Sequence, residues 1–289
     1  MSAIPLCQPP VRETRRPVLR TPPGATDCHT HVFESRYPLI PDRGYTPPDS
    51  TLADMLDMHA RIGIERVVFV QPSVYGTDNS AILDAMAVIP DRARAVVAID
   101  LSLSDAALGE LDRLGVRGVR LNLDNVGGMP IALAEVPALA HRIASLSWHL
   151  EFLFAGRHLP DLLSLFGSLP VPISIGHFGY MPATAGVDYP PFRALLGLVE
   201  AGNTWVKLSA PNRLGVGDLP PWEAVIPMAR ALIEANPDRM LWATDWPHPN
   251  KFGEIPNDAD LIEQLGLWAP DRRLQERILV TNPSVLYRY

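Results

Sequence analysis

The chain has 289 residues, of which 47% are hydrophobic, and a formal net charge of −7. That length suits one large domain or two ordinary ones, and a chain this apolar can bury a large core. The acidic balance and the lack of a basic block exclude a nucleic-acid-binding surface of the usual kind. Two cysteines, Cys7 and Cys28, form neither a disulfide framework nor a CxxC metal motif, which favours a reducing, cytoplasmic setting.

The first 25 residues, MSAIPLCQPPVRETRRPVLRTPPGA, are rich in proline and arginine. They lack the apolar core of a signal peptide, so we expect a tail that lies over the surface of a domain formed by residues 26–289. No apolar run is long enough to span a bilayer, and no membrane association is expected. The sequence does not decide between a monomer and a homo-oligomer.

From residue 26 onward, short β-branched runs alternate with longer stretches at helical spacing. The runs predict strands at residues 26–33, 66–72, 93–100, 118–123, 149–155, 172–178, 204–210 and 240–246. Helices are expected between them, for example at 51–63, 79–90, 131–146 and 221–237. Residues 271–289 predict a closing helix that packs a leucine and valine face on the rest. Strands this apolar suit a parallel sheet buried on both faces.

About eight strand–helix units in one chain predict a closed (β/α)8 barrel, an α/β fold with a single domain. The alternative, a doubly wound open sheet, normally carries a glycine-rich phosphate loop after its first strand. The segment HVFESRYPLIPDRGYTPP has no such pattern. Barrel enzymes work at the carboxyl ends of their strands, so we expect the functional site at that rim.

The segment DCHTHVF places His29 and His31 two residues apart, so both imidazoles should project from one face of the first strand. His177 stands near the end of the sixth predicted strand and Asp245 near the end of the eighth, which would bring three imidazoles and a carboxylate to one cavity. Such a set can hold one zinc ion, which commonly takes three protein ligands and water. It can equally supply hydrogen-bond donors and a base, and the spacing leaves both open.

Three motifs, DCHTHVF, IGHFG and WATDWPHPN, resemble those of the amidohydrolase superfamily. With VQPSVYGTDN, GVRLNL and LVTNPSVLY, the chain from about Asp27 to its end is similar to the 2-pyrone-4,6-dicarboxylate lactonase branch. The resemblance implies a (β/α)8 barrel that hydrolyses small, anionic lactones. It also implies that no metal is required. The residues themselves leave one zinc ion as the alternative, held by His29, His31, His177 and Asp245.

The same resemblance assigns individual roles. Asp245 matches the general base that activates water. The groups that polarise the lactone carbonyl match His29, His31 and His177. The substrate-binding positions match Tyr45, Ser73, Arg120 and Arg213. Ester hydrolysis independently requires a base near the water and donors at the developing oxyanion, and guanidinium groups suit substrate carboxylates.

Two positions depart from the family's pattern. The loop LDNVGGMP lacks a further basic residue that the family can carry, and Tyr180 stands where a relative can have arginine. Fewer cations indicate fewer substrate anions, or anions placed differently, so a differently substituted acidic lactone, such as a muconolactone or a sugar-acid lactone, is an alternative substrate. A zinc-dependent decarboxylase or hydratase of the same superfamily and a non-catalytic binding barrel are alternative functions.

Other polar residues are expected to have structural roles. Cys28 should face away from the two histidines, into the barrel wall, and Lys207 should form a structural ion pair. His248 either orients Asp245 or braces its loop. The remaining imidazoles are expected to be structural: His59, His141, His149 and His158.

Overall fold

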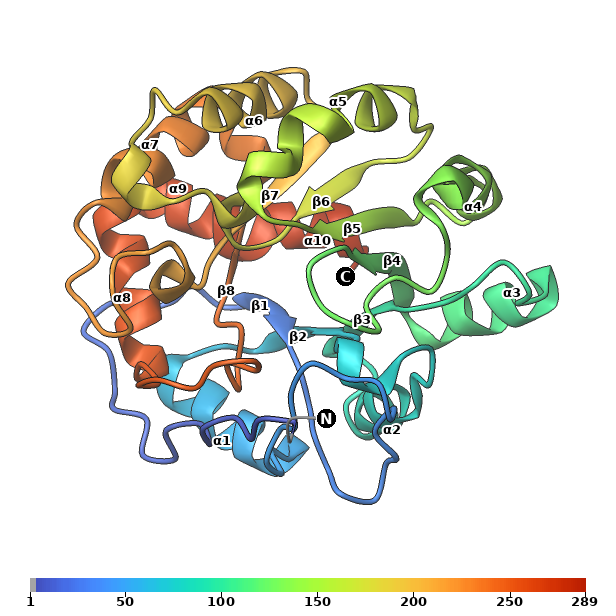
Figure 1. Cartoon of the computed structure of the whole chain (residues 1–289). Coiled ribbons are helices and arrows are strands. Elements are labelled where there is room, and N and C mark those ends of the chain that lie inside the picture. Colours follow the sequence, from blue (N-terminus) through green and yellow to red (C-terminus); the bar gives the residue numbers. More distant parts are fainter. Residues whose placement is uncertain (1–3) are drawn as a thin grey trace.

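The computed structural model describes residues 4–289, which form a barrel of parallel strands surrounded by helices (Figure 1). The strands pair in chain order as β1 (Thr26–Thr30), β2 (Arg66–Val70), β3 (Ala93–Val97), β4 (Val116–Asn122), β5 (His149–Leu153), β6 (Ile173–Ile175), β7 (Thr204–Ser209) and β8 (Met240–Ala243). The predicted barrel is confirmed. Within residues 4–289, no helix combines the length and apolar character needed to cross a membrane.

The helices on the outside are α1 (Leu52–Ile62), α2 (Ser80–Val88), α3 (Asp105–Leu114), α4 (Val136–Ala144), α5 (Leu159–Ser168), α6 (Pro190–Glu200), α7 (Val225–Ala235) and α8 (Asp258–Trp268). Local sequence sets their ends. In α1, Thr51 and Asp54 form a reciprocal capping box, and Gly63 ends the helix in a left-handed conformation with φ 79°. The helix predicted at 131–146 is shorter because Pro137 favours a start at Val136.

The predicted closing helix is broken into three pieces. These are α9 (Arg272–Glu276), a π-helical turn (Arg277–Thr281) and α10 (Asn282–Tyr287), which lies behind the strands in Figure 1. The expected leucine and valine face is only partly right, because Leu279 and Leu286 are buried while Val285 is 62% exposed. Tyr287 packs with inward-facing strand residues such as Val68, so the chain end closes the amino end of the barrel.

The N-terminal segment passes beside α1 and α8 (Figure 1). Cys7 N donates to Thr46 O (2.9 Å) in the loop after β1, and Gln8 N donates to Lys251 O (3.1 Å) in the loop after β8. The segment therefore ties together two loops at the carboxyl end of the barrel.

Barrel closure between β1 and the chain after β8 depends on the buried carboxylate of Asp27. Its Oδ1 accepts from His29 N (3.1 Å) and Thr244 N (3.1 Å), and its Oδ2 accepts from Thr244 Oγ1 (2.5 Å). His59 Nε2 on α1 lies 3.1 Å from the same Oδ2, which confirms a structural role for this histidine. One acid therefore joins β1, α1 and the end of β8.

Two main-chain bonds continue this seam toward the rim. Asp245 N donates to His29 O (3.0 Å), and His31 N donates to Trp246 O (2.8 Å). Because these bonds alternate between the two segments, they place Asp245 directly beside the paired histidines.

The prediction for Cys28 was wrong. The pairing of β1 with β2 shifts register between Asp27 and Thr30, so strict alternation of side chains fails there. Cys28 consequently packs inside the barrel, with Val68, Leu241 and Tyr287, one layer below the histidines.

Candidate active site

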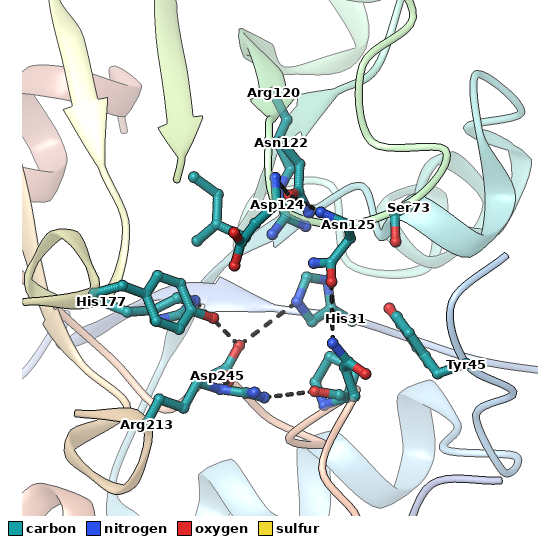
Figure 2. Close-up of a pocket in the computed structure, with 14 residues that line it drawn as sticks. His31, Tyr45, Ser73, Arg120, Asn122, Asp124, Asn125, His177, Arg213 and Asp245 are labelled. Atoms are coloured by element: carbon teal, nitrogen blue, oxygen red, sulfur yellow. Dashed lines mark hydrogen bonds and ion pairs between the residues drawn. The ribbon is translucent and has the colours of Figure 1, made fainter. Parts of the chain in front are cut away.

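A cleft opens at the carboxyl ends of the strands (Figure 2). Seven of the eight predicted site residues line it: His31, Tyr45, Ser73, Arg120, His177, Arg213 and Asp245. The eighth, His29, lies directly beneath and is fully buried. The walls also include Asn122, which the end of the fourth predicted strand places at this rim, and residues that sequence reasoning did not place in the site: Asp124, Asn125 and Asn250. Asp124 and Asn125 follow the end of β4 directly, which is the signal that could have found them.

Three imidazoles converge on one carboxylate oxygen. Asp245 Oδ1 lies 3.8 Å from His29 Nε2, 3.7 Å from His31 Nε2 and 3.5 Å from His177 Nε2. Asp245 and His177 both adopt left-handed backbone conformations, with φ 68° and 51°. Such conformations cost an L-residue roughly 1–2 kcal/mol, so the surrounding bonds hold both residues against their local preference.

The second ring nitrogen, Nδ1, of His31 and of His177 has a partner of its own. His31 Nδ1 lies 2.7 Å from Val70 O, which can only accept, so neutral His31 carries its proton on Nδ1 and presents a lone pair at Nε2. His177 Nδ1 lies 2.8 Å from Ser209 Oγ, a hydroxyl that can donate or accept. Of the three rings, only His31 has its neutral tautomer set by its partner.

A buried ion pair lies beneath His29. Lys207 Nζ on β7 donates to Glu151 Oε2 on β5 (2.5 Å), which confirms the structural ion pair expected for this lysine. Lys207 Nζ is also 3.1 Å from His29 Nδ1, and Glu151 Oε1 is 3.2 Å from the same atom. Glu151 was not identified from the sequence, although a carboxylate in the middle of a buried strand is itself a signal.

The charges of this layer are set by neighbours. Burial alone would raise the pKa of Glu151, but the Lys207 ammonium, together with His29 and Arg120, holds the pKa of the carboxyl well below its usual range. Burial lowers the pKa of Lys207, although the Glu151 carboxylate acts in the opposite direction and raises it. The pair is therefore ionised, with each member stabilising the other.

The upper layer consists of a carboxylate and neutral imidazoles. Burial would raise the pKa of Asp245, but the Arg213 charge, aided by His177, holds it well below its usual range. Burial lowers the pKa of His177 to about 3 despite the nearby Asp245 carboxylate. Burial also lowers the pKa of His29 and His31, so all three imidazoles are neutral at pH 7.

The two arginines of the cleft differ in their partners. Arg213 donates from Nε to Asp245 Oδ2 (2.7 Å) and from Nη2 to Pro249 O (2.6 Å), so its charge is already neutralised (Figure 2). Arg120 is 6% exposed and donates from Nη1 to Gln71 O (2.7 Å), while its Nε is buried without a partner. Within residues 4–289, no carboxylate forms an ion pair with Arg120.

The remaining histidines lie outside the cleft. His248 Nε2 faces Asp258 Oδ1 (3.1 Å) at the start of α8, so of its two predicted roles the structure supports loop bracing. His149 packs against the Tyr287 ring inside the barrel, with the ring centroids 5.4 Å apart. His141 and His158 lie on the surface.

The donor atoms fit a single divalent cation. One ligand atom from each of His29, His31 and Asp245 lies within 4.8 Å of the others, and all three residues are buried. His29 Nε2 has no hydrogen-bond partner, and His31 presents a lone pair toward the same point. These three residues, with His177 beside them, would hold a zinc ion, which when bound lowers the pKa of water and polarises carbonyls.

A parallel barrel with paired histidines at the end of β1, a histidine after β6 and an aspartate after β8 defines a hydrolase of the amidohydrolase type. The amidohydrolase family matches residues 26–289, and the chain belongs to that family.

Two relatives and one solved structure are similar to this chain over nearly its whole length. The chain is 38% identical to a 2-pyrone-4,6-dicarboxylate hydrolase from Comamonas testosteroni, over 94% of this chain and 92% of that one. It is 36% identical to a 4-sulfomuconolactone hydrolase from Rhizobium radiobacter, over 99% and 97%. A crystal structure of an Agrobacterium tumefaciens protein, 29% identical, superposes with a TM-score of 0.85 over 94% of this chain and 98% of that one.

The neutral state of His177 predicts how stability depends on pH. Unfolded His177 binds a proton below about pH 6.5, whereas the folded imidazole, with a pKa of about 3, does not. The unfolded state therefore gains protons as pH falls from 6 to 4, and His177 should lower the free energy of unfolding by about 1.4 kcal/mol per pH unit. Urea unfolding at several pH values should show a slope shallower by this amount in His177→Gln. The exposed His158→Gln control should keep the wild-type slope, and an unchanged slope in His177→Gln would contradict a neutral buried imidazole.

Proposed function

We propose that the protein hydrolyses a small lactone that carries a carboxylate, which Arg120 binds while Asp245 activates water. The observation that carries this proposal is the unpaired guanidinium of Arg120. A buried charge without a counter-ion is costly, so a cleft that keeps one is built to receive an anion. Ser73 Oγ is also buried without a partner and lines the same cleft, where it can bind the same anion.

Lactone hydrolysis fits both the relatives and the cluster. Both named relatives are lactone hydrolases of similar length. A water beside Asp245 Oδ1 would give its proton to that carboxylate as its oxygen attacks the lactone carbonyl carbon. When the ring C–O bond breaks, protonated Asp245 returns the proton to the leaving ring oxygen. The low pKa of Asp245 makes it a weak base, so the carbonyl must be strongly polarised.

The three histidines have different roles in this reaction. His29 and His177 can each carry a proton on Nε2, because Lys207 and Ser209 can donate to their Nδ1 atoms. Both can then donate to the oxyanion that forms on the carbonyl. His31 cannot do so in its neutral form, because its proton is on Nδ1. Its Nε2 accepts a hydrogen bond from the attacking water, a different role from the polarising one that the resemblance implies.

Substitution of Asp245 tests its role as the base. Asp245→Asn should lower kcat about 100-fold or more while leaving KM within a small factor, because the amide cannot take the proton of the water. Steady-state kinetics on an acidic lactone measures this, with circular dichroism to check folding. Near-normal turnover in the folded variant would remove Asp245 from this role.

Substitution of each arginine tests whether it binds the substrate carboxylate. Arg120→Met should lower kcat/KM for an acidic lactone by about 30-fold, roughly 2 kcal/mol, and affect a neutral lactone much less. Arg213→Met should impair both lactones, because Arg213 also holds Asp245. The exposed Arg193→Met serves as the matched control. Equal losses on both substrates in Arg120→Met would show that Arg120 is structural and that the substrate need not be an anion.

Removal of metal tests whether the reaction requires a bound ion. We propose that no metal is obligatory, because His29 and His177 can themselves donate to the carbonyl. Protein stripped with a strong chelator should keep its lactonase activity, and one equivalent of zinc should not raise it. Complete loss on stripping, with stoichiometric recovery on adding zinc, would instead identify His29, His31 and Asp245 as metal ligands and favour the zinc-dependent alternative.

A further inference from the structure

The cleft contains four charged side chains whose formal charges cancel. Arg120 and Arg213 contribute two positive charges, and Asp245 and Asp124 contribute two negative charges. Asp245 pairs with Arg213, which leaves Arg120 as the unpaired cation and Asp124 as the unpaired anion. Among residues 4–289, no basic side chain forms an ion pair or a hydrogen bond with the Asp124 carboxylate.

The position of Asp124 is fixed by its loop. Asn122 Oδ1 accepts from both Asp124 N and Asn125 N, each at 3.0 Å, which sets a tight turn directly after β4. Gly128 N donates to Asn125 O (3.0 Å). A Cβ on Gly128 would lie 2.5 Å from Asn122 O, so the turn requires glycine there. Across the cleft, Asn250 Nδ2 donates to Asn125 Oδ1 (3.0 Å).

The surroundings of Asp124 suit neutral polar groups of a ligand. Asn122 Nδ2 is buried without a hydrogen-bond partner and lines the cleft. Tyr180, whose pKa burial raises, is a neutral phenol on the same cleft. Amide, phenol and carboxylate groups together can satisfy hydroxyl groups, since a carboxylate accepts and an amide N–H donates. They offer no cation to a second carboxylate of a substrate.

We propose that the cleft selects lactones that carry one carboxylate, bound by Arg120, and hydroxyl groups, and that Asp124 is the residue that rejects a second carboxylate. This inference rests on the proposed lactonase function and names its substrate class. Asp124 is exposed at the rim of the cleft. It accepts hydrogen bonds from substrate hydroxyls, whereas a second carboxylate placed beside it would meet a like charge with no cation to compensate it.

The test compares two lactones that differ in this respect. Galactarolactone carries one free carboxylate and several hydroxyl groups, and 2-pyrone-4,6-dicarboxylate carries two carboxylates and no hydroxyl. Wild-type kcat/KM should favour the first by tenfold or more. Asp124→Asn keeps the size of the side chain and removes its charge, so it should raise kcat/KM for the dicarboxylate at least tenfold and lower it severalfold for galactarolactone.

Two variants serve as controls. Asp124→Glu keeps the charge and should keep the wild-type preference. Asp91→Asn makes the same change of charge on an exposed residue before β3, at the other end of the barrel, and should leave both rates unchanged.

The outcomes separate this inference from the proposed function. A wild-type preference for the dicarboxylate, or a ratio that Asp124→Asn leaves unchanged, would overturn the inference while lactone hydrolysis stands. If neither lactone were hydrolysed, the proposed function would fail, and calorimetric titration of the wild-type protein with both compounds would still decide selectivity. Tighter binding of galactarolactone, weakened in Asp124→Asn, would support the inference, and equal binding or none would overturn it.

Discussion

The seam that closes the barrel between β1 and the chain after β8 is the constraint on which the site depends. The buried carboxylate of Asp27 accepts hydrogen bonds from both sides of this seam. The main-chain bonds that follow bring His29 and Asp245 together from opposite ends of the chain. Because Asp245 sits in a left-handed conformation, its carboxylate points into the cleft only as long as those bonds hold its backbone.

Two layers of paired charge support this arrangement. The lower layer is the Lys207–Glu151 ion pair, which surrounds His29 Nδ1 with a donor and an acceptor. The upper layer is the Arg213–Asp245 pair, which orients the carboxylate and lowers its pKa. Each charge in these two layers thus has a counter-charge, which offsets the cost of burying it in a low-dielectric interior. Arg120 is the buried charge of the cleft without a counter-charge, whereas Asp124 is exposed, and both line the space where a ligand would bind.

A low pKa and a catalytic base are in tension. The same Arg213 that orients Asp245 also makes it a poor proton acceptor. A site of this kind works by polarising the electrophile and positioning the water more than by basicity. The neutral imidazoles serve that purpose, because a neutral ring can donate from one nitrogen and accept at the other. Their tautomers are therefore as important as their positions.

Much of this protein followed from the sequence alone. The alternation of apolar runs and helical stretches predicted the (β/α)8 barrel, because parallel strands buried on both faces leave that periodic pattern. The barrel in turn placed the site at the strand ends, where His31, His177 and Asp245 were expected and are found. Strand ends were less certain, since each strand stops one to three residues before its predicted limit.

Pairing across the barrel was decided only by the tertiary structure. Cys28 points inward because a register shift in β1 interrupts the alternation on which the prediction rested. Arg213 was expected to bind substrate, but which arginine is already neutralised and which is unpaired depends on contacts between strands far apart in sequence. The same holds for Glu151 and Lys207, 56 residues apart, which meet because the barrel closes. Sequence periodicity records which residues are buried, whereas charge compensation arises from distances that only the closed barrel sets.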